Sequence, residues 1–276
     1  MRFRFRFWVV LGSFLLLGIA IFATSGAEVI KAFQQPVFET AFSGAFVKHC
    51  FPEKEWLMYI STCIVPIFLF EMFFGTFIYS DVERCGVYVF TRQPNRVLWY
   101  FGKTVKLLGM SVIFYTAFSL TGVVVLLLWG ITPANITDAV VLVLCATVSY
   151  ALFGFVVAMA VNIFAALINS GYAFSVINIL LVGSLALVVI QDVSIELSDY
   201  TFGSAFLWNP VANLVPSWHT FSRQTLDVTA RELLNIDFFP YKITFIFFCG
   251  LALGVALVGA PVYKRIQLLS FTKENE

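Results

Sequence analysis

The chain has 276 residues, of which 60% are apolar and 12% are charged. Soluble domains carry about 25% charged residues, so this composition excludes an ordinary soluble domain and predicts a protein that lies in a lipid bilayer. The net charge of +1 carries little information, because charge in a membrane protein matters by the side of the bilayer on which it lies.

Six apolar segments are long enough to cross the roughly 30 Å hydrocarbon core of a bilayer as helices. They cover residues 8–24, 56–79, 104–130, 139–163, 173–191 and 243–262. The first follows MRFRFRF and could be a signal peptide, but its apolar part is longer than usual and five more spans follow, so we expect an uncleaved helix. The predicted fold class is all-α integral membrane, with residues 1–276 forming one six-helix domain.

The basic residues predict that both termini are cytoplasmic. Eleven of the 17 Lys and Arg residues lie before the first span, between or just inside the second and third spans, or after the sixth, and eleven of the 16 acids lie on the other side. Cytoplasmic connections carry an excess of Lys and Arg. We therefore expect a multi-pass protein of a bacterial plasma membrane, with outer loops at 25–55 and 192–242.

The first outer loop contains a short helical pattern. Phe38, Phe42 and Phe46 recur every four residues after Pro36. This spacing predicts a short amphipathic helix.

The segment 80–103 is the largest cytoplasmic element expected between spans, and six of its 24 residues are charged. Gly86 is a plausible helix end, Pro94 interrupts the helix because it lacks an N–H group, and Asn95 can cap a new helix. We expect a short helix, a turn and a second helix that enters the third span. The alternative is a positively charged anchor with no further role.

A nucleotide site in this segment is not expected. Gly102-Lys103-Thr104 matches the end of the phosphate-binding pattern GxxxxGK[ST], but Val97 stands where that pattern requires its first glycine.

The pattern E-R-x-x-G-x-Y-x-x-x-T-R-x-P-x-R-x-x-W-x-x-x-K, from Glu83 to Lys103, resembles the first cytoplasmic loop of ABC-2 type exporter permeases. The six-span layout, the long outer loop before the sixth span and the basic tail Tyr263-Lys264-Arg265 are also similar. One departure is that many members begin with a longer amphipathic elbow helix, whereas only MRFRFRF precedes the first span here.

In that family the loop carries a coupling helix that docks on a separate ATPase. The resemblance implies cytoplasmic ABC ATPase partners that bind ATP and Mg²⁺, no cofactor on this chain, and a second permease subunit, identical or related. It places the coupling contacts at Asp81, Glu83, Arg84, Gly86, Tyr88, Arg92, Pro94 and Arg96.

Glu71 is the acid that falls inside a predicted span. Counting from Trp56 at 1.5 Å per residue places it roughly 22 Å below the outer surface, in the inner third of the bilayer. A buried carboxylate is usually paired or functional. We expect an ion pair with a basic residue at 84, 92 or 96, or a contact with a second copy of the chain; a substrate or proton-relay role is the alternative.

Other polar and small residues in the spans predict helix packing. Asn162 and Asn178 are expected to form hydrogen bonds between helices. The pairs Gly250 and Gly254, and Gly154 and Ala158, would let helices approach closely, within the chain or with a second copy.

The stretch FGSAFLWNPVANLVPSWHTF (202–221) is apolar, but two prolines prevent one spanning helix. We expect a re-entrant or interfacial hairpin at the outer leaflet, similar to the broken outer helices of the family, with a surface loop as the alternative. In an exporter this element would form an outer gate, which we place at Trp208, Asn209, Pro210 and Pro216.

The expected function is that of a permease subunit that moves an amphipathic or hydrophobic substrate, such as an antimicrobial-type peptide or a drug, outward by alternating access. The chain is not expected to be an enzyme or to bind nucleic acid: no HExxH motif, intramembrane aspartate pair or metal-ligand cluster is present, and the two histidines, at 49 and 219, lie far apart. The five cysteines show no CxxC spacing. The alternatives are a non-catalytic assembly or sensor subunit and, less well supported, an intramembrane enzyme.

Overall fold

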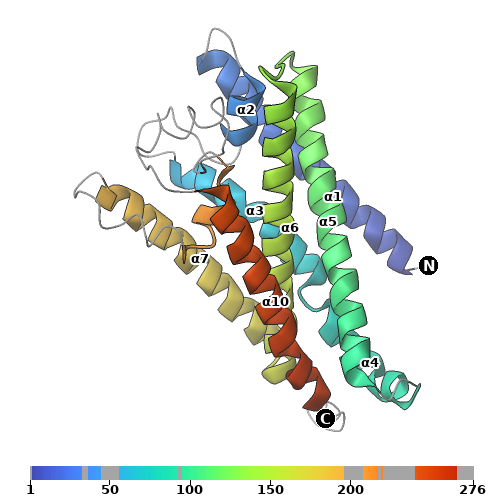
Figure 1. The fold of residues 1–276 in the computed structure, drawn as a ribbon. Helices are drawn as coiled ribbons and strands as arrows, with labels where there is room; N and C mark the ends of the chain where they lie inside the picture. Colours follow the sequence, from blue (N-terminus) through green and yellow to red (C-terminus); the bar gives the residue numbers. More distant parts are fainter. Residues whose placement is uncertain are drawn as a thin grey trace.

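A computed structural model of the chain describes residues 2–32, 37–44, 56–92, 95–195, 208–216, 219 and 240–265. The described residues form helices and connecting turns, with no β-strand among them (Figure 1). The elements are α1 (Arg2–Ala32), α2 (Phe38–Gly44), α3 (Trp56–Phe74), α4 (Phe77–Arg92), α5 (Arg96–Leu128), α6 (Ile136–Leu167), α7 (Ser170–Ile195), the 3-10 helix η1 (Ala212–Leu214) and α10 (Tyr241–Arg265).

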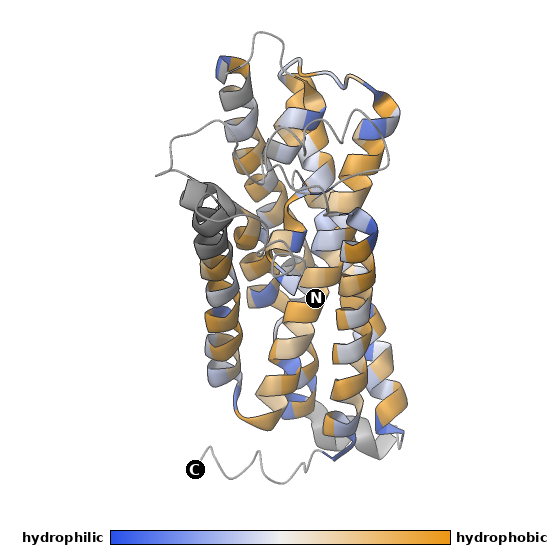
Figure 2. Ribbon diagram, turned by 60° about the vertical axis from the view of Figure 1, so that its left-hand side comes forward, coloured by the Kyte–Doolittle hydropathy of each residue, from blue (hydrophilic) through white to orange (hydrophobic). Residues whose placement is uncertain are grey.

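Six helical segments in these residues are long and apolar enough to cross a membrane. They are Phe7–Ala27, Cys63–Arg84, Arg96–Leu128, Ile136–Leu167, Ser170–Leu187 and Tyr241–Arg265. Apolar residues cover most of the length of the long helices in Figure 2. The prediction of an all-helical fold with six apolar spans is therefore confirmed.

Helix α6 lies at the centre of the bundle. It contacts α2, α3, α4, α5, α7, α10 and η1. It is predominantly apolar, and 19 of its 32 residues are buried, which is typical of a central helix. Gly154 is required by close packing, because a Cβ atom there would collide with the ring of Tyr115 from α5.

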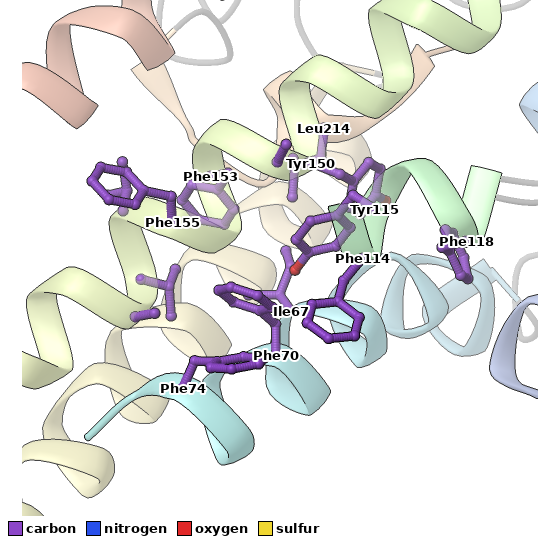
Figure 3. Packing of buried hydrophobic residues seen from close by; sticks show 14 of the residues in the cluster. Ile67, Phe70, Phe74, Phe114, Tyr115, Phe118, Tyr150, Phe153, Phe155 and Leu214 are labelled. Atoms are coloured by element: carbon purple, nitrogen blue, oxygen red, sulfur yellow. The ribbon is translucent and has the colours of Figure 1, made fainter. Parts of the chain in front are cut away.

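An aromatic cluster joins α1, α3, α5 and α6. The Tyr115 ring lies 5.6 Å from Phe14, 5.6 Å from Phe70 and 5.9 Å from Tyr150, measured between ring centroids. These separations are typical of favourable aromatic pairs. Figure 3 shows Phe70, Tyr115 and Tyr150, with Leu214 of η1 beside Tyr150, so the segment before α10 also reaches the core.

The second predicted span, 56–79, is not one helix. Helix α3 ends at Phe74 and α4 begins at Phe77. The fully buried Asn162 of α6 lies at this break: its Oδ1 accepts hydrogen bonds from the N–H groups of Ile78 (2.7 Å) and Tyr79 (3.0 Å), and its Nδ2 donates to the Phe74 carbonyl (3.2 Å). A broken helix inside a membrane is tolerated when neighbouring groups satisfy its free backbone atoms, and Asn162 does so here.

The short helix predicted in the first outer loop is present as α2, and Phe46 lies outside the described residues. Phe38 and Phe42 are buried, and Phe42 stacks on Phe22 of α1 at 5.1 Å. The Glu39 carboxylate accepts hydrogen bonds from the N–H groups of Ala134 and Asn135, each at 3.2 Å. Helix α2 is thus packed into the bundle and ties α1 to the start of α6.

The alternating Arg and Phe residues of MRFRFRF do not suggest a helix, but α1 begins at Arg2 and continues into the first span. Within the described residues no separate elbow helix precedes it. A continuous helix satisfies backbone N–H and C=O groups as the chain enters an apolar environment.

Replacing Asn162 by Leu is expected to lower the thermal stability of the detergent-solubilised protein strongly. The substitution leaves two N–H groups and one carbonyl without partners at a buried break, and each such group costs about 1–3 kcal/mol. Asn169→Leu is the matched control, because the Asn169 side chain is exposed and accepts one hydrogen bond, from the N–H of Gly171. Loss of this hydrogen bond should lower the stability by about 1 kcal/mol. Equal decreases in melting temperature would contradict the role of Asn162.

Candidate functional site

The α4–α5 hairpin contains the residues that the sequence predicts to be coupling contacts. Helix α4 continues through Gly86 to Arg92, so the prediction that a helix ends at Gly86 is wrong. The α-helical pattern of hydrogen bonds tolerates a single glycine at a modest cost. Asn95 caps α5 as predicted, and its side chain accepts a hydrogen bond from the N–H of Leu98 at 3.1 Å.

The other predicted coupling residues lie along this hairpin. Glu83 and Arg84 are exposed on α4, and Arg96 is the first residue of α5. Tyr88 and Arg92 belong to α4 by their backbone, and Pro94 lies outside the described residues.

Asp81 does not point freely into solvent. Its carboxylate forms an ion pair with Lys103 of α5. The Lys103 ammonium also lies 5.4 Å from the Phe77 ring centroid and 5.8 Å from that of Trp99, within the range of cation–π attraction. These contacts join the two legs of the hairpin where it leaves the bundle. Lys103 belongs to the Gly102-Lys103-Thr104 sequence, which does not complete a phosphate-binding pattern. In the structure Lys103 instead joins α4 to α5.

Two tyrosines connect the hairpin to the rest of the bundle. The rings of Tyr100 (α5) and Tyr263 (α10) stack with centroids 5.0 Å apart. The Tyr100 hydroxyl donates to the carbonyl of Ala256 at 3.0 Å, and the Tyr263 hydroxyl donates to the carbonyl of Asn162 at 2.9 Å. Gly259 provides the space, because a Cβ atom there would meet the Tyr100 ring. The sequence analysis missed this link, since nothing local pairs the two rings.

A cleft of about 510 Å³ opens beside the hairpin. Helices α1, α3, α4 and α5 line it with apolar side chains, including Phe7, Val10 and Phe74, and its polar end is formed by Ser80, Asp81 and Arg84 on α4. Its volume lies within the range of about 300–1,000 Å³ that is typical of ligand pockets. One polar end and a long apolar lining suit an amphipathic molecule.

Glu71 lies on α3 with a side chain that is 1% exposed. Its Oε1 accepts a hydrogen bond from Nδ2 of Asn178 on α7 at 3.2 Å. The described contact of Glu71 is with this amide, so the predicted ion pair of Glu71 with Arg84 or Arg96 is not what the structure shows. The side chain of Arg92 lies outside the described residues. The partner of Glu71 is instead the neutral amide of Asn178, which the sequence analysis expected to form a hydrogen bond between helices.

The predicted outer-gate residues lie in segment 208–216. Asn209 is buried and its Nδ2 donates to the carbonyl of Ser184 in α7 at 2.9 Å. Pro216 is buried and Pro210 is half-buried. Trp208 is 73% exposed, and its ring centroid lies 6.1 Å from that of Phe247 in α10. Figure 1 shows this segment between α7 and α10.

A buried network of side-chain hydrogen bonds holds the same segment against α10. Thr244 of α10 donates to Oδ1 of Asn213 at 2.6 Å and lies 2.9 Å from Nε2 of His219. His219 Nδ1 faces the Val215 carbonyl at 2.7 Å, so Nδ1 carries the hydrogen and donates. The sequence analysis missed Asn213 and Thr244, because ordinary polar residues near a helix start carry no distinctive pattern.

The glycines predicted to mediate packing differ in their surroundings. Gly154 and Ala158 are buried within the bundle. Gly250 and Gly254 are exposed on α10, and no atom lies within 4 Å of a Cβ built on either. In the described part of the chain, no group of three or more His, Cys, Asp or Glu residues is arranged to hold a metal ion.

Comparisons of the chain with known protein families, with curated proteins and with solved structures found no match.

Lowering the pH is expected to destabilise the contact of His219 with α10. Burial lowers the pKa of His219 from 6.5 to about 4, against a smaller opposing effect of the Val215 and Pro216 carbonyls. The neutral imidazole therefore stabilises the fold above pH 6.5, and this stabilisation, about 3 kcal/mol, is lost as the pH falls towards 4. In His219→Gln, this loss of stability between pH 6.5 and pH 4 should be absent. Parallel melting-temperature curves for both proteins between pH 7 and 4 would contradict this assignment.

Proposed function

We propose that the chain is the permease subunit of an ATP-driven exporter, as its resemblance to ABC-2 type permeases implies. The observation that carries the proposal is the attachment of the α4–α5 hairpin to the bundle. The ion pair of Asp81 with Lys103 joins its legs, and Tyr100 connects it to α10. A separate ATPase that moves this hairpin would therefore also move the helices behind it.

The proposed orientation has both termini and the α4–α5 hairpin in the cytoplasm of a bacterial cell. The excess of basic residues in these parts of the chain supports it. The ATPase would bind ATP and Mg²⁺, so this chain would need no cofactor and no catalytic residue of its own. A second copy, or a related subunit, would complete the transmembrane pathway.

The proposed substrate is amphipathic or hydrophobic, such as a peptide or a drug. The cleft beside the hairpin supports this class, because Ser80, Asp81 and Arg84 form a polar end to an apolar lining. A free ion would gain little from such a surface.

The proposed outer gate is a re-entrant or interfacial hairpin that includes segment 208–216. Two contacts support it: Asn209 binds Ser184, which lies within the apolar part of α7, and Asn213 binds Thr244, which lies within the apolar part of α10. Alternating access would then require segment 208–216 to separate from α7 or α10 as the outer side opens.

Co-purification tests the coupling assignment. A cytoplasmic ATPase should be recovered with the wild-type chain, and the double substitution Arg92→Glu and Arg96→Glu should abolish its recovery, because it replaces two positive charges on the proposed docking surface by negative ones. Lys31→Glu with Lys242→Glu is the matched control: it makes the same change of charge at exposed sites away from the hairpin.

Accessibility of the hairpin to a membrane-impermeant label should be measured for each variant, since a change of basic residues can invert a membrane protein. Retained ATPase binding in a correctly oriented Arg92→Glu, Arg96→Glu protein would exclude this docking site. Recovery of a different stable partner and no ATPase would favour an assembly or sensor subunit.

A further inference from the structure

Glu71 and Asn178 face each other between α3 and α7, next to the break in the second span. Glu71 lies in the last turn of α3, four residues before Gly75. Asn178 Nδ2 donates to Glu71 Oε1 at 3.2 Å and to the Phe174 carbonyl of its own helix at 2.8 Å. The amide hydrogens of Asn178 are therefore both used.

Two oxygen atoms of this pair remain without a hydrogen-bond partner in the described part of the chain. They are Glu71 Oε2 and Asn178 Oδ1, and both are buried. Both are acceptors if Glu71 is ionised. An ionised Glu71 would then hold a negative charge in an apolar span with a single neutral donor, which is strongly unfavourable.

Glu39 shows the opposite arrangement in the same chain. It is also buried, and each of its two carboxylate oxygens accepts a hydrogen bond from a backbone N–H group at 3.2 Å. The difference between these two glutamates lies in the number of donors that the fold directs at them.

We infer that Glu71 and Asn178 form a proton-binding site that joins α3 to α7. The Glu71 carboxylate takes one proton from the aqueous phase onto Oε2 and becomes a neutral carboxylic acid; no other bond breaks. The new O–H group is a donor, and the amide that already donates to Oε1 offers Oδ1 as its acceptor. An acid and an amide paired in this way form two hydrogen bonds in one ring, and both unpartnered oxygens become satisfied.

Within the described residues, the contacts of Glu71 include no cation that would balance its ionised form. On α5, Tyr115 lies within electrostatic range of Glu71, but its hydroxyl donates to the Pro66 carbonyl at 3.3 Å. Tyr150 of α6 and Cys63 of α3 lie beyond that ring. On α7 the group that contacts Glu71 is the neutral amide of Asn178. A metal ion would require more oxygen ligands than the two that this pair leaves open.

The position of the site gives proton binding a structural consequence. Gly75, at the break that follows Glu71, packs so closely against Phe174 of α7 that a Cβ atom there would lie 3.0 Å from its ring. When the proton leaves, a negative charge and two oxygens without a donor remain between α3 and α7, and the hydrogen bond from the Glu71 O–H group to Asn178 is lost. Proton binding therefore favours the packed position of α7, whether or not the chain is an exporter subunit.

Infrared spectroscopy of the full chain in lipid nanodiscs tests whether Glu71 holds a proton. The C=O stretching band of a protonated, buried carboxyl group should be present at neutral pH and should disappear when the pH is raised. Glu71→Gln should lack this band, whereas Glu39→Gln should retain it. Absence of the band from the wild type over the whole pH range, or its persistence in Glu71→Gln, would overturn the inference.

A distance measurement tests the consequence for α7. Spin labels are attached at Met72→Cys on α3 and Ile179→Cys on α7, both exposed positions, after the five native cysteines are replaced by alanine. The distance should increase as the pH is raised in the wild-type background. It should stay short at every pH in Glu71→Gln, because the glutamine amide can donate to Asn178 Oδ1 without a titratable proton.

Two results of this distance measurement would reject the proposed proton-binding site. One is the same pH response in Glu71→Gln as in the wild type, which would place the titrating group elsewhere. The other is a short distance restored at high pH by added Na⁺, which would make the pair a site for a metal cation. The Glu39→Gln variant should respond to pH like the wild type, since Glu39 lies on α2, away from this interface.

Discussion

The carboxamide of Asn162 satisfies the helix break on which the arrangement of this bundle depends. A break inside an apolar span leaves backbone donors and acceptors that no water can reach, so the chain must supply partners from another helix. Asn162 does this for the end of α3 and the start of α4, and its own backbone carbonyl accepts the hydroxyl of Tyr263 from α10. One residue of the central helix thus fixes three neighbouring helices. These hydrogen bonds account for a polar side chain at a fully buried position.

The break also determines what lies beside it. Because α3 ends at Phe74, Glu71 falls in its final helical turn, where Asn178 of α7 donates to it, and Gly75 lets Phe174 approach. The same fold surrounds Glu39 with two N–H donors at the start of α6. Two glutamates in one chain therefore have different environments: Glu39 accepts two backbone N–H groups, whereas Glu71 accepts one side-chain N–H, from Asn178.

The two regions that connect helices across the bundle are built differently. At the α4–α5 hairpin, tyrosine rings pack into spaces left by small residues, and Tyr100 beside Gly259 shows how closely the helices approach. Segment 208–216 is instead held by hydrogen bonds: Asn209 donates to the Ser184 carbonyl of α7, and Thr244 of α10 donates to Asn213. Close packing resists relative movement, because displacement loses many contacts at once. Hydrogen bonds between a loop and a helix can separate a few at a time, so the second region is the more suitable place for a gate.

The sequence by itself determined that the chain is helical and has six apolar spans, because a bilayer requires long apolar runs whose backbone groups are satisfied within each helix. It also located the start of α5, since an Asn cap after a proline acts within one turn. It did not predict the break after Phe74, the neutral partner of Glu71 or the stacking of Tyr100 on Tyr263. Those features join residues that lie far apart in the chain, such as Glu71 and Asn178, and the apolar stretches between them carry no signal of which side chains will meet. Only the tertiary structure, by packing α3, α7 and α10 around α6, decided these partners.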